Sequence, residues 1–258
     1  MWPTRNAPLT ARSVLASVLL GTDPPRLATP LLVRTGELFG ITEGTVRTAL
    51  SRMAAAGEVE ADDGSYRLTG RLVERQRRQA ASRRADVRGW DGTWELATVD
   101  TSDARPAADR AALRDALSTL RLAELREGVW GRPDNLDPER SPDAGAVATE
   151  WCTGWRGATP AEPPDVMALW PLDPWRADAD ELRRAMAALL ERLEGGDATA
   201  LADGFVVSAS VLRLFQHDPL LPGALLPADW PGASIRSEYD RYDEAYRHTL
   251  RDWFRRSS

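Results

Sequence analysis

The apolar residues near the start of the chain recur at helical spacing in three short segments. The segments are residues 10–20, 29–39 and 43–56. In each, apolar side chains stand three or four positions apart, which is typical of amphipathic helices. Thr10 and Thr42 occupy the positions of N-caps. Gly40 and Gly57 occupy positions where helices commonly end. The second and third helices are therefore separated by a very short turn, as in a helix-turn-helix.

A hairpin is predicted directly after the third helix. Residues 58–61 and 66–68 flank an Asp-Asp-Gly turn, and an Asp-Gly turn between two short segments is a hairpin signal. A hairpin in this place is a wing. Residues 70–84 then form an expected helix that is rich in arginine.

The rest of the chain predicts a small α+β module followed by helices. Strands are expected at 94–99, 128–131 and 146–152, with a helix at 107–122, a loop at 133–145 and later helices at 178–193, 203–215 and 234–256. This order suggests a ferredoxin-like module. The expected fold class is α+β. We expect a winged helix-turn-helix DNA-binding domain with its basic connecting helix at 1–88, a ferredoxin-like middle domain at 89–175 and a mainly helical C-terminal domain at 176–258.

The charge distribution separates the front of the chain from the rest. The net charge of −6 would by itself argue against a nucleic-acid-binding protein. Residues 1–90, however, have a net charge of +5, and residues 91–258 have −11. The chain has no lysine, so every cationic side chain is an arginine fork that can bind phosphate or guanine at two points. A basic front on an acidic body is expected when one module meets DNA and another does not.

The composition gives no reason to expect a metal, a cofactor or a membrane. Cys152 is the one cysteine, and His217 and His248 lie far from it, so the clustered spacing of a zinc site is missing. No uninterrupted apolar run approaches the ~18 residues of a membrane span. Residues 1–9 lack the apolar stretch of a signal peptide. We expect a cytoplasmic protein.

The third helix is expected to read DNA with its outer face. Its core side is taken by Val46, Ala49, Leu50 and Met53. The predicted DNA-contacting residues of this helix and its start are Thr42, Gly44, Thr45, Arg47, Thr48, Ser51 and Arg52. Arginine forks match guanine in the major groove, hydroxyls bind bases or phosphates, and the free amides of a helix start attract phosphate. An ordinary solvent-exposed helix is the alternative interpretation.

Further DNA contacts are predicted behind this helix. Tyr66 and Arg67 lie on the wing, and Arg71 begins the basic helix, whose arginines would attract phosphates regardless of sequence. Asp62 and Asp63 at the hairpin tip would repel phosphate. We therefore expect the wing to lie along the DNA backbone and the third helix to supply most of the specificity.

A series of motifs runs through nearly the whole chain. They are FGITEGTVRTALSRM at 39–53, YRLT at 66–69, WDGTW at 90–94, GVW at 128–130 and FQHDPLLPGALLPADWPG at 215–232. In content and order they resemble the motifs of the PaaX-type repressors, which regulate phenylacetic acid degradation.

The resemblance implies a function and partners. It implies a homodimer that binds a palindromic, double-stranded operator and represses transcription. In the best-known members phenylacetyl-CoA releases the repressor, so the expected effector is an aryl- or acyl-CoA thioester or an aromatic acid. No residue of the ligand site can be matched to a family motif.

Two other classes of function stay open. A metal-dependent nuclease could use Asp100 and Asp103, which follow the first strand of the middle module and could hold magnesium. The same residues could simply begin a loop, and we expect no enzyme. An interaction scaffold could use its tryptophans to stack on a ring, although such residues are more often core anchors. The tryptophans in question are Trp151, Trp155, Trp170 and Trp175.

Overall fold

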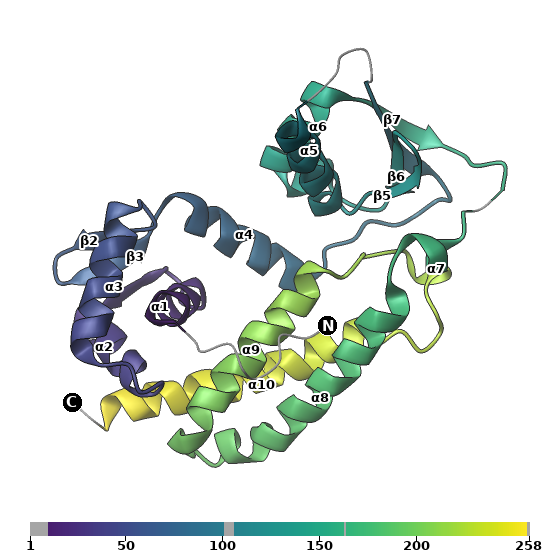
Figure 1. Ribbon diagram of the computed structural model, residues 1–258. Coiled ribbons are helices and arrows are strands. Elements are labelled where there is room, and N and C mark those ends of the chain that lie inside the picture. The colour runs from purple at the N-terminus through teal and green to yellow at the C-terminus, as the bar shows by residue number, and fades with distance from the viewer. Residues whose placement is uncertain (1–9, 101–105, 163, 257–258) are drawn as a thin grey trace. The chain divides into compact units, whose positions relative to one another are not determined.

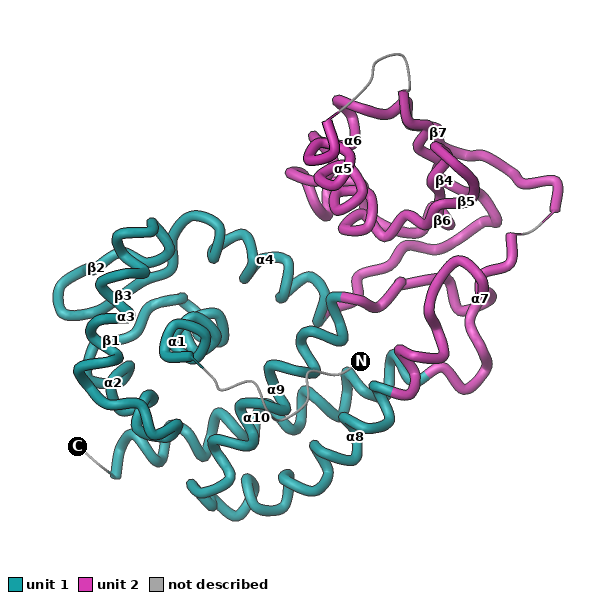
Figure 2. Tube along the Cα trace, in the orientation of Figure 1, with its two compact units in different colours: residues 1–83, 178–216, 231–258 teal, residues 84–177, 217–230 magenta. Residues whose placement is uncertain are grey.

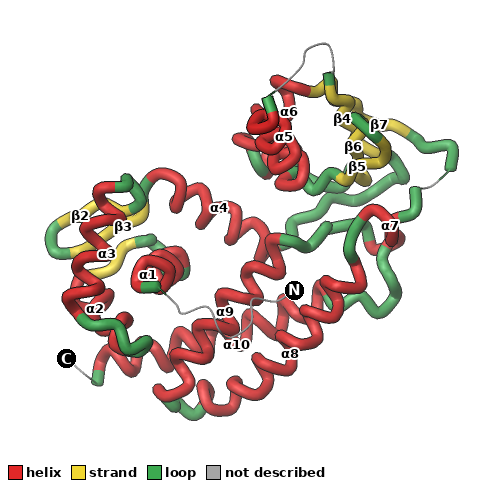
Figure 3. Tube along the Cα trace, in the orientation of Figure 1, coloured by secondary structure: helices red, strands yellow, loops and turns green. Residues whose placement is uncertain are grey.

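The computed structural model describes residues 10–100, 106–162 and 164–256 (Figure 1). The chain forms two compact units, the first made of residues 1–83, 178–216 and 231–258 and the second of residues 84–177 and 217–230 (Figure 2). The predicted α+β class, with N-terminal helices, a sheet in the middle region and a helical C-terminal part, is confirmed (Figure 3). The division into three domains at residues 88 and 175 stays a prediction.

The N-terminal part of the first unit combines helices with a small sheet. Its elements are α1 (Ala11–Leu20), β1 (Arg26–Ala28), α2 (Thr29–Glu37), α3 (Glu43–Ala55), β2 (Val59–Asp62), β3 (Ser65–Leu68) and α4 (Gly70–Arg84). The strands pair antiparallel in the order β1-β3-β2. Both predicted caps are present, since Thr10 Oγ1 accepts the amide of Ser13 at 3.1 Å and Thr42 Oγ1 accepts that of Thr45 at 3.4 Å. The sequence pattern did not predict β1, which is only three residues long.

The helices α1, α2 and α3 share one apolar core. Leu15, Leu32 and Leu50 contribute one fully buried side chain from each helix. The helices α2 and α3 lie close together at Gly36, where an added Cβ would lie 2.5 Å from Cγ2 of Val46. Only glycine leaves room for that approach. The orientation of α3 is therefore tied to that of α2.

Three long helices complete the first unit. They are α8 (Leu172–Glu194), whose first residues lie in the second unit, α9 (Leu201–Gln216) and α10 (Gly232–Arg255). The hydroxyl of Tyr242 on α10 donates to the carbonyl of Gly204 on α9 at 3.0 Å, and Thr249 Oγ1 donates to the carbonyl of Leu193 on α8 at 2.6 Å. By length and composition alone, Ala198–Gln216 could cross a membrane, but Phe205 and Phe215 within it are core residues.

The second unit has the ferredoxin-like order of elements. They are β4 (Trp94–Val99), α5 (Ala107–Thr119), β5 (Ala123–Arg126), β6 (Val129–Pro133), α6 (Pro142–Trp151), β7 (Cys152–Ala158) and the short α7 (Val166–Leu169). The four strands are antiparallel in the order β5-β6-β4-β7. A β-α-β-β-α-β chain with this strand order is a ferredoxin-like sheet.

The prediction of a strand at 146–152 is wrong. Those residues lie mostly in α6, and the last strand of the sheet is β7, which follows them. Pro142 stands at the first helical position and starts the helix inside the stretch expected to be a loop. Ala148 and Trp151 then pack on the core formed by Leu113 and Leu117 of α5. Tertiary contacts of α6 therefore outweighed the β-branched residues that favoured a strand.

A fully buried arginine fastens residues 218–220 to the sheet of the second unit. Arg132 on β6 donates to the carbonyls of Pro219 (3.3 Å) and Leu220 (3.0 Å) and to Asn135 Oδ1 (2.7 Å). Its side chain is 0% exposed, and its Nε lies 3.6 Å from Glu95 Oε1. Burial lowers the pKa of Arg132 to about 9. The guanidinium therefore joins β6 to a loop that is distant in sequence.

We expect Arg132→Leu to destabilise the second unit by about 3 kcal/mol, because buried carbonyl groups and Glu95 would lose their donor. Urea unfolding followed by tryptophan fluorescence would measure the loss, since Trp94 and Trp170 are buried in this unit. The matched control is Arg126→Leu on the exposed edge strand β5. Equal midpoints for the two variants would contradict a clamping role for Arg132.

Candidate nucleic-acid interface

The predicted reading residues form one exposed face of α3. Thr42, Gly44, Thr45, Arg47, Thr48, Ser51 and Arg52 are all exposed. The opposite side of the helix is buried, with Val46 and Leu50 at 0% exposure and Met53 at 1%. The structure therefore brings these residues together on a polar surface that no described part of the chain covers.

The start of α3 is preorganised by its own hydroxyl groups. Thr42 and Thr45 share a hydrogen bond between their Oγ1 atoms at 2.9 Å, and Thr48 Oγ1 donates to the carbonyl of Gly44 at 2.8 Å. An added Cβ at Gly44 would meet no atom within 4 Å, so the space in front of this turn is open. A large ligand can therefore come close to the first turn of α3.

The two arginines of α3 differ in their partners. Arg47 Nε and Nη2 each lie 2.7 Å from Glu43 Oε1, one turn earlier on the same exposed surface. Such exposed pairs contribute little stability, so Arg47 can leave Glu43 at small cost. The side chain of Arg52 has no hydrogen-bond or ion-pair partner within the described residues. Its guanidinium is therefore the cation of this face most available to an anion or a base.

The charged side chains of the wing are paired with one another. Arg67 on β3 lies opposite Glu60 on β2, and their side chains are 2.6 Å apart (Nη2–Oε2). Asp62 at the tip is 3.1 Å from Nη1 of Arg26 on β1, which the sequence pattern did not identify as a site residue. Tyr66 is half-buried against the apolar core. Of the two predicted wing residues, Arg67 alone is exposed, and it has an acidic neighbour.

Behind α3, a buried carboxylate holds two arginines. Arg12 on α1 donates from Nε to Glu58 Oε2 at 2.9 Å and makes a second contact to Oε1. These hydrogen bonds lower the pKa of Glu58. The predicted site residue Arg71 lies 3.9 Å from the same carboxylate and remains 89% exposed. Sequence reasoning missed Arg12 and Glu58 because they are far apart in the chain.

The basic helix α4 divides into an outward part and an internal part. Arg75 and Arg78 are exposed, and no acidic partner contacts them within the described ranges. Partial desolvation of the Arg75 guanidinium lowers its pKa most, although the residue is exposed to solvent, and the nearby cation Arg213 lowers it further. The arginines of this helix were all expected to attract phosphates. Arg83 instead binds Asp243 at 2.7 Å, so it is not available to a phosphate.

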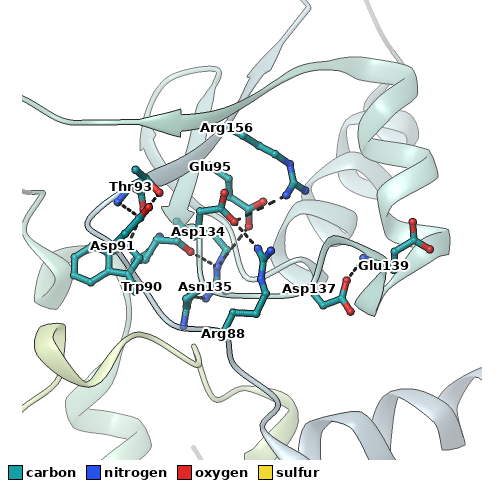
Figure 4. Close-up of polar contacts among 12 residues, drawn as sticks. Arg88, Trp90, Asp91, Thr93, Glu95, Asp134, Asn135, Asp137, Glu139 and Arg156 are labelled. Atoms are coloured by element: carbon teal, nitrogen blue, oxygen red, sulfur yellow. Dashed lines mark hydrogen bonds and ion pairs between the residues drawn. The ribbon is translucent and has the colours of Figure 1, made fainter.

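In a second polar cluster, on the sheet of the second unit, arginine and acidic side chains pair with one another (Figure 4). Arg88 Nη2 lies 2.7 Å from Asp134 Oδ1, and Arg156 Nη1 lies 4.0 Å from the same oxygen. Burial raises the pKa of Glu95, while Arg132 acts in the opposite direction. Carboxylates and guanidinium groups alternate in this cluster. We therefore interpret it as a structural contact that holds the residues near Arg88 against the sheet.

The structure gives little support to the two alternative functions, a metal-dependent nuclease and an interaction scaffold. Asp100 follows β4, and its amide donates to the carbonyl of Trp151 at 3.0 Å, while Asp103 lies outside the described residues. No group of three or more His, Cys, Asp or Glu side chains within the described ranges could hold a metal ion. Trp170 and Trp175 are buried, which fits core anchors. Trp155 is 54% exposed.

We expect the Arg12–Glu58 pair to make the first unit sensitive to acid. The lowered native pKa of Glu58 means that its contribution is complete above its ordinary pKa of 4.5 and is lost as pH falls through the native value. The stability difference between the wild type and Arg12→Gln should therefore shrink below that pH in thermal unfolding. Arg77→Gln, which breaks the exposed pair with Glu74, is the control. A difference that does not change with pH would refute this account.

The chain is similar to known proteins over nearly its whole length. Three family descriptions match in order: "PaaX-like protein" at residues 10–72, "PaaX protein central Cas2-like domain" at 87–150 and "PaaX-like protein C-terminal domain" at 170–256. A solved structure of an uncharacterised protein from Mycobacterium tuberculosis is 40% identical, covering 95% of this chain and 98% of that one, with a TM-score of 0.71. No protein with a curated description matches.

Proposed function

Since this chain belongs to the PaaX-like family, whose members are transcriptional regulators, we propose that it binds double-stranded operator DNA through the exposed face of α3. The observation that carries the proposal is the division of α3 into a fully buried apolar side and an exposed side of arginine, serine, threonine and glycine. In this proposal α2 and α3 are the two helices of a helix-turn-helix, and β2 and β3 are its wing.

The proposed contacts follow from the partners that each residue has in the free protein. Arg52 is available for guanine, and Arg47 reaches a base after leaving Glu43. Thr42, Gly44 and Thr45 at the helix start suit a phosphate. On α4, Arg71, Arg75 and Arg78 supply attraction to the DNA backbone. The paired charges of the wing make it a neighbour of the backbone rather than the main reader.

We further propose that the protein works in the cytoplasm as a homodimeric repressor. Two copies would place their α3 helices in successive major grooves of a palindromic operator. An aryl- or acyl-CoA thioester, or a free aromatic acid, would release the DNA by binding better to a dimer with the wrong spacing. The support for these details is membership in the family.

We expect Arg52→Ala to weaken binding to the operator by roughly 1–3 kcal/mol and to relax the preference for one base pair. Arg47→Ala should cost less, because the wild type must first break the pair with Glu43. Fluorescence anisotropy with duplexes substituted one base pair at a time would measure both effects. The control is Arg126→Ala on the exposed edge of the second unit. If neither variant on α3 changed the affinity, this helix would not be the reader.

One titration tests the function as a whole. The probe is a labelled duplex covering the region upstream of the gene for this chain, with a random-sequence duplex as the competitor. We expect the protein to bind the upstream duplex in the presence of the competitor. We also expect one member of a panel of acyl-CoA thioesters and aromatic acids to release it. Cleavage of the duplex with magnesium, abolished by Asp100→Ala, would support the nuclease instead.

A further inference from the structure

The last turn of α10 is held by an arginine of α2. Arg34 donates from Nη1 to the carbonyl of Phe254 at 3.0 Å and from Nη2 to that of Trp253 at 3.5 Å. Its guanidinium carbon also lies 4.5 Å from the centroid of the Trp253 ring. One side chain of the first helix of the proposed helix-turn-helix therefore caps the C-terminal end of a helix more than two hundred positions away.

This contact uses the charge, the planar face and the hydrogen-bond donors of the guanidinium group. The last carbonyls of a helix have no partner within the helix and carry a partial negative charge, which a cation satisfies. The planar face stacks on the indole while the edge donates to the two carbonyls. Lysine keeps the charge but has neither a planar face nor a fork. The contact is therefore specific to arginine.

The position of Arg34 on α2 carries the contact to α3. Gly36 follows two residues later, at the point where α2 lies too close to Val46 of α3 for any added carbon atom. Phe39, two residues after the end of α2, packs edge-on against Phe205 of α9, with ring centroids 5.0 Å apart. Movement of α2 relative to the C-terminal helices would therefore move α3 as well.

A second contact ties α10 to the helix that follows the wing. Arg83 near the end of α4 binds Asp240 and Asp243, at 2.7 Å each, and lies 4.9 Å from the centroid of the Tyr239 ring. Along α10, Asp240 and Trp253 are about 20 Å apart. The helix α10 therefore contacts the N-terminal region on both sides of α3 in the chain, at α2 and at α4.

We propose that α10 positions the DNA-reading helix, and that Arg34 is the positioning residue through which its last turn sets the orientation of α3. The inference rests on the proposed function, because it assigns to α10 control of the affinity that α3 provides. It makes the C-terminal helix a place where DNA affinity can be changed without any contact to DNA.

The variants Arg34→Lys and Trp253→Ala test the proposal with the full-length protein and the labelled upstream duplex. Each should lower the affinity about fivefold to tenfold. The double variant should lose less affinity than the sum of the two single losses, because both changes act on the same side-chain contact. Trp253→Phe keeps an aromatic ring and should restore most of the affinity. Arg255→Gln, which breaks only the exposed pair with Asp252 on the same turn, should change nothing.

Two readouts separate positioning from a direct contact or a general loss of stability. A direct phosphate contact would be kept by Arg34→Lys, and Arg34→Gln would reduce the slope of log affinity against log salt by about one. Positioning predicts the reverse: Arg34→Lys fails and Arg34→Gln leaves the slope unchanged. Hydrogen exchange is measured without DNA in the wild type and in Arg34→Lys. The substitution should accelerate exchange of the α3 amides more than that of the α9 amides.

Three results would overturn the inference. They are wild-type affinity in both Arg34→Lys and Trp253→Ala, a reduced salt slope in Arg34→Gln, and equal acceleration of exchange in α3 and α9. Failure of the wild type to bind either duplex would instead refute the proposed function, and hydrogen exchange alone would then decide whether Arg34 positions α3.

Discussion

The close approach of Gly36 to Val46 is the constraint on which the polar face of α3 depends. A side chain at Gly36 would clash with Val46, so α3 would have to move away from α2. Close packing transmits such displacements because an apolar interior has no free volume to absorb them. The position of the exposed polar face of α3 therefore depends on an apolar contact on the buried side of the helix.

Ion pairs within the fold then decide which arginine side chains remain available to contact another molecule. Most cations of the first unit have an acidic neighbour within the fold, as Arg67 has Glu60 and Arg83 has Asp243. Arg52 and Arg78 do not have one among the described residues. The chain has no lysine, and a guanidinium group remains charged in nearly every surrounding, so its availability depends on geometry alone.

Local patterns predicted the elements, and distant contacts decided the rest. The helices and caps near Thr10 and Thr42 could be predicted because apolar spacing and capping act within one or two turns. The strand expected at 146–152 was wrong because α6 depends on packing against α5. The exposed face of α3 was predicted from its own periodicity. Arg34 and its carbonyl partner on Phe254 are 220 positions apart, and no local pattern could connect them.

The contacts of α10 with α2 and α4 have a consequence for protein synthesis. The ribosome produces α10 after every other element described above, so α3 is complete in sequence long before the helix that contacts α2 and α4 exists. A chain that terminates early, or is cut before residue 232, contains all of α3 but none of α10. Such fragments carry the exposed polar face of α3 without the contacts that α10 makes with α2 and α4.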